Sequence, residues 1–154
     1  MSTVSHDTFT LERTYPTTPE RVFAAWAKSE AKVQWFGEDD EFEKTDEHTL
    51  DFREGGREHF AGVMPDSTTV TYDAVYEDIV DGERIVTSYV MHIGGHRISV
   101  SLMTVEIEAV PGGARLVLTE QDAFLDGLDN VEQRRAGTEQ LLAKLGDFLA
   151  TSAT

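Results

Sequence analysis

The stretch RIVTSYVMHIGGHRISVSLMTVEIEAVPGGARLVLTEQ, residues 84–121, decides the fold of this chain. It contains three runs rich in β-branched and aromatic residues, and glycine pairs at 94–95 and 112–113 separate these runs. Such residues favour strands, and strands joined by short glycine turns lie antiparallel. The stretch therefore predicts three consecutive antiparallel strands, namely Arg84–Ile93, Arg97–Val110 and Ala114–Gln121.

Four more strands are expected on the N-terminal side of this stretch. Alternation of apolar and polar residues predicts the first of them, and turn signals rich in glycine, proline and aspartate separate the others. With the three strands above, they would form one antiparallel meander of six strands, with the first strand as a seventh member. The four are Thr8–Tyr15, Thr49–Arg53, Glu58–Met64 and Thr68–Ile79.

Two short helices are expected between the first and second strands. Thr18 followed by Pro19 is typical of a helix start, because threonine caps the first turn and proline is tolerated there. A second helix is predicted over Ala31–Phe36, and Gly37 would end it. These helices would close one end of the sheet.

A long amphipathic helix is predicted over Asn130–Ala150. Apolar residues recur there every three or four positions, and Asp129 would cap the first turn. Gly137 lies inside this helix, and we expect close packing to be the reason for it. An antiparallel sheet must cover one face, and this helix is long enough to cover it. The fold class is therefore α+β: a curved antiparallel sheet wrapped around the C-terminal helix, with space between them.

Composition and charge narrow the range of functions. The 154 residues include 29 acidic and 13 basic ones, which gives a formal net charge of -16. Such a surface repels nucleic acids and anionic lipids, so neither is an expected partner. The sequence has no cysteine, which excludes disulfides and thiolate chemistry, and no apolar run is long enough to span a membrane. No signal peptide is recognisable, so a cytoplasmic location is expected.

The length predicts one domain. We expect a flexible N-terminus over residues 1–7, a single domain over residues 8–150 and a tail over residues 151–154. Seven acidic residues fall within Glu38–Glu47, beside the two short helices. A solvated loop or edge strand is the favoured interpretation of this acidic run, and a cation site is the alternative. An acidic rim would disfavour anionic ligands by long-range repulsion, which physiological salt screens beyond about 8 Å, so we expect a neutral or cationic ligand.

Three motifs and the order of the elements point to a known family. The motifs are PERVFAAW (Pro19–Trp26), AKVQWFG (Ala31–Gly37) and DFREGGRE (Asp51–Glu58). Together with the closing helix, they make the chain resemble the START-like SRPBCC superfamily, which has the helix-grip fold of the birch-pollen allergens. Within it, the chain resembles the homologues of the activator of a heat-shock protein ATPase, in their stand-alone, polyketide-cyclase-like bacterial form. The resemblance covers residues 9–149.

The resemblance implies a hydrophobic cavity between sheet and helix, and it leaves three functions open. The leading hypothesis is binding of a small hydrophobic or aromatic molecule in that cavity. The second is an enzyme of the cyclase, dehydratase or hydrolase kind, and the third is a co-chaperone-like module that stimulates a heat-shock protein ATPase. Relatives form dimers, so a homodimer is also implied. No cofactor is expected, and a turn between His92 and His96 disfavours a zinc site.

Glu120 and His92 are the candidate catalytic residues. Alternation places Glu120 on the same face as Leu118, so both would point toward the cavity. A carboxylic acid in apolar surroundings has a raised pKa unless it is paired, and Arg134, Arg135 or His92 could be the partner. A Glu–His pair could act as general acid and base, whereas a structural ion pair or a glutamate at the cavity mouth is the alternative.

A further set of residues is expected to bind the ligand. Tyrosine hydroxyls suit a ligand with one polar end, and Asp126 would either contact the ligand at the mouth or serve the turn before the helix. Large apolar residues are more often plain core, but some core residues line the cavity in such a fold. The set is Trp26, Trp35, Phe36, Phe60, Met64, Tyr72, Tyr76, Tyr89, Asp126, Arg134 and Arg135.

Overall fold

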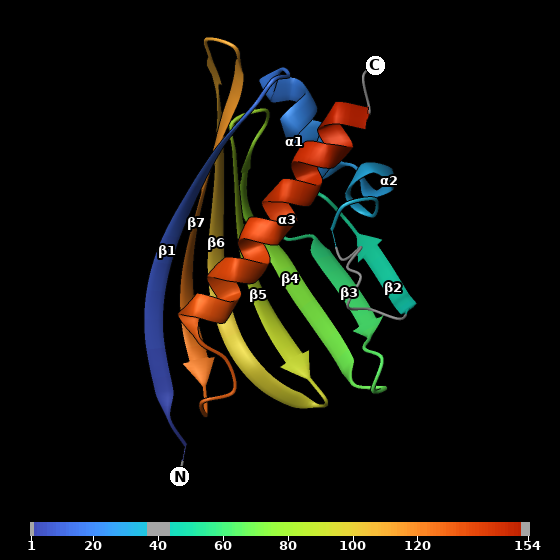
Figure 1. Cartoon of the computed structure of the whole chain (residues 1–154), viewed down its shortest axis with the longest axis vertical. Helices are drawn as coiled ribbons and strands as arrows, with labels where there is room; N and C mark the ends of the chain where they lie inside the picture. Colours follow the sequence, from blue (N-terminus) through green and yellow to red (C-terminus); the bar gives the residue numbers. More distant parts are fainter. Residues whose placement is uncertain (1, 37–43, 152–154) are drawn as a thin grey trace.

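One curved sheet of seven antiparallel strands wraps around the long C-terminal helix α3 (Val131–Thr151), as Figure 1 shows. The computed structural model describes residues 2–36 and 44–151 of the chain. The helices α1 (Pro19–Ala27) and α2 (Ser29–Lys32) lie at the end of the sheet near the C-terminus of α3. The strands are β1 (Val4–Tyr15), β2 (Lys44–Leu50), β3 (Arg57–Val63), β4 (Thr69–Val80), β5 (Arg84–Ile93), β6 (His96–Val110) and β7 (Gly113–Leu125).

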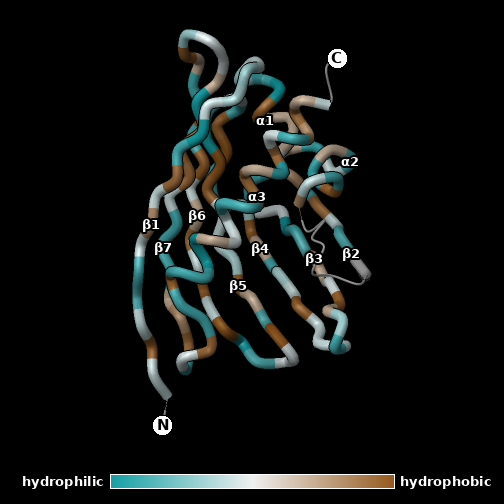
Figure 2. The backbone as a smooth tube through the Cα atoms, in the orientation of Figure 1, coloured by the Kyte–Doolittle hydropathy of each residue, from teal (hydrophilic) through white to brown (hydrophobic). Residues whose placement is uncertain are grey.

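The strand order β1-β7-β6-β5-β4-β3-β2 is a meander in which only β1 leaves the order of the sequence. Short hairpins join β3 through β7, and β1 closes the sheet by pairing with β7. Apolar and polar residues alternate along the strands in Figure 2, because neighbouring side chains point to opposite faces. The predicted α+β helix-grip architecture is confirmed.

The ends of several elements differ from the prediction. β1 begins at Val4, which pairs with Leu125, so most of the segment predicted to be flexible belongs to the sheet. β2 spans Lys44–Leu50, whereas the strand was predicted at Thr49–Arg53, so the two ranges share only residues 49 and 50. Residues 38–43 of the acidic run lie outside the described residues, and its last part begins β2.

The second short helix is shorter than predicted. It spans Ser29–Lys32, and a turn carries Trp35 and Phe36, which were expected to be helical. Both aromatic side chains are nevertheless buried, because the turn directs them into the core beneath α1. The expected stop at Gly37 lies outside the described residues.

The predicted N-terminal cap of α1 is confirmed, whereas the cap of α3 is the residue after the predicted one. Thr18 caps α1 by accepting a hydrogen bond from the Arg21 backbone N–H at 3.2 Å, as predicted. Asn130, and not Asp129, caps α3, because its Oδ1 accepts from the Gln133 backbone N–H at 2.9 Å. The Asp129 carboxylate instead accepts from the Asn130 backbone N–H at 2.8 Å and from Arg134 Nη2 at 2.9 Å, and it thereby contributes to the site described below.

The two halves of α3 pack differently against the sheet. In the C-terminal half, Leu142 and Leu145 are fully buried, and the Tyr15 hydroxyl donates to the Leu142 carbonyl at 2.9 Å. In the N-terminal half, a Cβ placed on Gly137 would meet no atom within 4 Å. The expectation that close packing explains Gly137 is therefore wrong, since this glycine borders open space. Among the described helices, none is long and apolar enough to cross a membrane.

Candidate functional site

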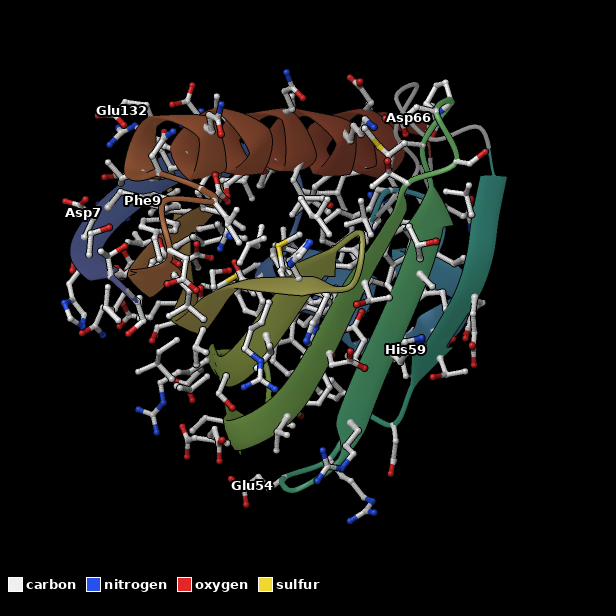
Figure 3. The ribbon with its side chains drawn as sticks, turned by 90° about the horizontal axis from the view of Figure 1, so that it is seen from below. Asp7, Phe9, Glu54, His59, Asp66 and Glu132 are labelled. Atoms are coloured by element: carbon white, nitrogen blue, oxygen red, sulfur yellow. The ribbon has the colours of Figure 1, made fainter. Side chains whose placement is uncertain are left out.

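The open space under the N-terminal half of α3 is a cavity of about 250 Å³. In Figure 3 side chains from one face of the sheet lie between the sheet and α3, whereas Glu132 on this helix points away from the sheet. The volume is below the roughly 300 Å³ at which drug-sized sites begin, but above the roughly 150 Å³ that holds benzene in an apolar cavity. The cavity therefore suits a molecule of one or two rings.

The walls of the cavity are mainly apolar, with Glu120 and Arg134 at one end and with Gln140 and Lys144 further along α3. Aromatic rings and methionines from β3 to β6 form most of the sheet side, and α3 supplies the opposite wall. The lining residues are Phe36, Phe60, Val70, Tyr72, Tyr89, Met91, Met103, Glu120, Gln133, Arg134, Gly137, Thr138, Gln140, Leu141 and Lys144.

Arg134 occupies the polar end and faces three carboxyl groups. Its Nη2 donates to Asp129 Oδ2 at 2.9 Å, and its Nη1 lies 3.5 Å from Glu120 Oε2 and 3.4 Å from Asp122 Oδ1. We call these four residues the cavity cluster. Arg134 is on the first turns of α3, and both Glu120 and Asp122 lie on the inward face of β7. The arginine is 8% exposed, so these contacts form away from water.

Hydroxyl groups accept the remaining hydrogen bonds of the Arg134 guanidinium group. Nη2 donates to Ser99 Oγ at 2.7 Å, and Nη1 donates to the Tyr89 hydroxyl at 2.9 Å and to Ser101 Oγ at 3.2 Å. Tyr89 in turn donates to Glu120 Oε1 at 2.7 Å. Because both Nη atoms already have several acceptors, Arg134 holds the cluster together and has little capacity to bind an anionic ligand.

Glu120 keeps its proton at neutral pH. Burial and a hydrogen bond with the neighbouring Asp122 carboxylate raise the pKa of Glu120 to about 8, against the opposing effects of Arg134 and Tyr89. Asp122 Oδ2 is buried and has no hydrogen-bond partner in the described part of the chain if Glu120 and Asp122 are both ionised. A protonated Glu120 can donate its proton to the Asp122 carboxylate and so supply the missing hydrogen bond. The cluster then holds one cation and two anions beside the cavity.

A second buried cluster lies near α2 and does not line the cavity. Lys32 Nζ donates to Glu58 Oε1 at 2.6 Å, the Tyr76 hydroxyl donates to the same oxygen at 2.7 Å, and His48 Nε2 lies 2.7 Å from Oε2. We call these four residues the sealed cluster. Burial alone would raise the pKa of Glu58, but the Lys32 charge and the three hydrogen bonds lower it to about 2. This carboxylate is therefore ionised and fully partnered.

Comparison with known proteins connects this geometry to a family. Residues 16–150 match the model of the family described as "Activator of Hsp90 ATPase homolog 1-like protein". The chain belongs to this family. The resemblance predicted from the three motifs and the element order is thereby confirmed. No curated protein matches the chain.

Solved structures of bacterial relatives agree with this membership. A protein from Rhizobium leguminosarum is 42% identical, with a TM-score of 0.94 and 99% of each chain covered. The Mll3558 protein from Rhizobium loti is 43% identical, with a TM-score of 0.88, and the match covers 96% of this chain and 99% of that one. An AHSA1-like protein from Aeromonas hydrophila shares the fold at 17% identity, with a TM-score of 0.71 over 96% of this chain and 94% of that one.

The structure brings together some of the predicted site residues. Glu120 points inward with Leu116 and Leu118, as alternation along β7 predicted, and Arg134 is its cationic neighbour. The predicted residues that line the cavity are Phe36, Phe60, Tyr72, Tyr89, Glu120 and Arg134.

His92 does not belong with Glu120. Side chains at Tyr89 and Met91 face the cavity, so alternation along β5 directs His92 to the opposite face, where it pairs with Thr71 of β4. The predicted Glu120–His92 pair is therefore wrong. Arg135 is also misplaced, because it lies on the outer side of α3 and pairs with Glu139 at 3.2 Å.

The remaining predicted residues lie elsewhere in the fold. Trp26 and Trp35 form an edge-to-face pair in the core, 4.8 Å between ring centroids, and Tyr76 belongs to the sealed cluster. Met64 borders the turn between β3 and β4. Asp126 serves the turn before α3, since its Oδ1 accepts from the Thr3 backbone N–H at 3.0 Å and its φ is 56°. None of these five is among the residues that line the cavity.

The sequence prediction missed part of the sheet side of the cavity, the α3 wall apart from Arg134, and the sealed cluster. Val70, Met91 and Met103 share the inward face with residues that were predicted, so extending the alternation along their strands would have found them. Glu58 also has a sequence signal, because it lies two residues before buried Phe60 and hence on the same face.

Proposed function

We propose that this chain binds a small, largely apolar molecule of one or two rings in the cavity between α3 and the sheet. The observation that carries the proposal is the combination of an apolar wall with a polar cluster at one end. Ligand sites are typically apolar concavities with a few well-placed polar groups. The volume of about 250 Å³ supports a small ligand.

Charge supports an uncharged or cationic ligand over an anionic one. Asp122 and Asp129 outnumber Arg134 in the cavity cluster, and Arg134 already donates to both. An anion beside the cavity cluster would have to leave water for surroundings of net negative charge, which is unfavourable, whereas the cationic Lys144 lines the cavity further along α3. The formal net charge of -16 acts in the same direction at longer range.

The test uses 2-ethylnaphthalene, an uncharged aromatic probe of two rings, with calorimetry or NMR titration to measure binding. Gly137→Met should weaken binding at least tenfold, because Gly137 borders open space and a long side chain there would fill the cavity mouth. Ala136→Met is the matched control, since Ala136 is exposed and does not line the cavity. Equal binding to all three proteins, or no binding to the parent chain, would contradict the proposal.

The other hypotheses stay predictions. The acid–base enzyme retains Glu120, which holds a proton beside the cavity, but His92 is not its partner, so Tyr89 and Arg134 would have to assist. Stimulation of a heat-shock protein ATPase would be tested by adding this chain to a chaperone and measuring ATP hydrolysis. Dimerisation and cytoplasmic location are likewise expectations for solution and cell experiments.

A further inference from the structure

Tyr72 stands out among the residues that line the cavity, because its hydroxyl is buried and unpartnered in the described part of the chain. The residue is 6% exposed. Its ring is held between two other lining residues, with centroids 5.0 Å from Phe36 and 4.8 Å from Tyr89. A buried hydroxyl without a partner costs free energy that a suitable ligand atom would recover.

Neighbouring tyrosines show how the hydroxyl of Tyr72 differs. The Tyr89 hydroxyl donates to Glu120 at 2.7 Å, and the Tyr76 hydroxyl donates to Glu58 at 2.7 Å. Tyr72 lies near both carboxyl groups but bonds to neither. Burial and then the charge of Glu58 raise the pKa of Tyr72 well above its usual value, so the hydroxyl keeps its proton and is available as a donor.

We infer that the Tyr72 hydroxyl selects the polar end of the ligand, and that this end is the acceptor oxygen of an uncharged group such as a ketone or aldehyde carbonyl. The inference rests on the proposed function and narrows its ligand class. A hydrocarbon would leave the hydroxyl unpartnered. A carboxylate would accept the bond but would place a further negative charge near the buried carboxylate of Glu58.

The experiment compares three probes of nearly the same shape: 2-acetylnaphthalene, 2-ethylnaphthalene and 2-naphthoate. The ketone should bind the parent chain about fivefold to tenfold more tightly than the hydrocarbon, which is the usual net effect of one hydrogen bond. The naphthoate should bind more weakly than either. In Tyr72→Phe, the ketone and the hydrocarbon should bind equally.

Two controls separate recognition from structural effects. Tyr72→Phe should unfold at the same temperature as the parent chain or higher, because it removes a hydroxyl that has no partner. Tyr76→Phe removes a buried hydroxyl outside the cavity, so it should keep the preference for the ketone over the hydrocarbon. A loss of that preference in Tyr76→Phe would overturn the assignment to Tyr72.

The outcomes distinguish this inference from the proposed function. Equal binding of the ketone and the hydrocarbon by the parent chain would overturn the inference and leave the proposed function standing. Tightest binding of 2-naphthoate would also overturn it. Binding of none of the three probes would overturn the proposed function and the inference together.

Discussion

The sealed cluster and the cavity cluster each contain a buried ion pair, but they balance the charges in opposite ways. In the sealed cluster, a single acid, Glu58, receives hydrogen bonds from three side chains. In the cavity cluster, a single cation, Arg134, faces three acids. The pKa of Glu58 is accordingly lowered to about 2, whereas the pKa of Glu120 is raised to about 8.

This difference separates a structural ion pair from a candidate binding site. Both oxygens of Glu58 have a partner, and none of the four residues of the sealed cluster lines the cavity. Beside the cavity, by contrast, Glu120 carries a proton and the Tyr72 hydroxyl has no partner in the described part of the chain. Perturbed pKa values and unpartnered polar groups cluster at functional sites, whereas the lowered pKa of Glu58 is explained by its complete set of partners. The cavity end is therefore where function is expected.

The largest expected effect comes from breaking the sealed cluster. Lys32→Met removes the cation from Glu58 and should lower the free energy of unfolding by about 3–5 kcal/mol, because a buried carboxylate loses its partner. The double variant Lys32→Met with Glu58→Met should recover most of that loss, since neither charge then remains. Urea denaturation at neutral pH measures both.

Lys28→Met is the matched control for this experiment. Lys28 is exposed, lies directly before α2, and its side chain makes no capping hydrogen bond. Its replacement should therefore change the free energy of unfolding by less than about 0.5 kcal/mol. If Lys32→Met cost no more than Lys28→Met, the sealed cluster would have no structural role, and the contrast with the cavity cluster would fail.

Glu120 of the cavity cluster should make the free energy of unfolding depend on pH. Because the pKa of Glu120 is raised from 4.5 to about 8, the folded chain binds one proton more than the unfolded chain between these values. This contribution to stability is complete below pH 4.5 and is lost as the pH rises toward 8, by at most about 1.4 kcal/mol per pH unit. Glu58 acts oppositely, since its contribution is lost as the pH falls from 4.5 toward 2.

Glu120→Gln isolates that contribution from the other titrating groups. The stability of this variant relative to the parent chain should increase between pH 5 and pH 8, because glutamine cannot lose a proton. Urea denaturation at several pH values gives the difference directly. A difference that stayed constant across this range would show that Glu120 is ionised throughout, and the raised pKa would be refuted.

Regular alternation made the sheet side of the site predictable. Glu120 was placed correctly because side chains along a strand reverse face at each residue. The same rule excludes His92, which lies three residues after inward-facing Tyr89 and hence on the opposite face, so residue type alone does not identify the partner of Glu120. The sheet and its single covering helix were predictable for the same reason, since both depend on short-range periodicity.

Contacts that depend on docking were not predictable from local pattern. Lys32 and Glu58 are 26 residues apart, and their contact depends on how a four-residue helix sits against β3. Asp129 and Asn130 are both good capping residues, so local preference could not show that Asn130 caps α3 while Asp129 binds Arg134.

The smallest expected effect comes from the two glycines of α3, of which Gly137 borders the cavity and Gly146 packs against Tyr15 of β1. A Cβ on Gly137 would meet open space, whereas a Cβ on Gly146 would lie 3.2 Å from Tyr15 Cε1. Tyr15 has little room to move, because it is buried and its hydroxyl is bonded to Leu142. Gly137→Ala should therefore stabilise the chain by about 0.5–1 kcal/mol through helix propensity, while Gly146→Ala should lower its stability or leave it unchanged. Thermal unfolding measures both, and an equal gain from the two variants would mean that α3 is no more tightly packed over the core than over the cavity.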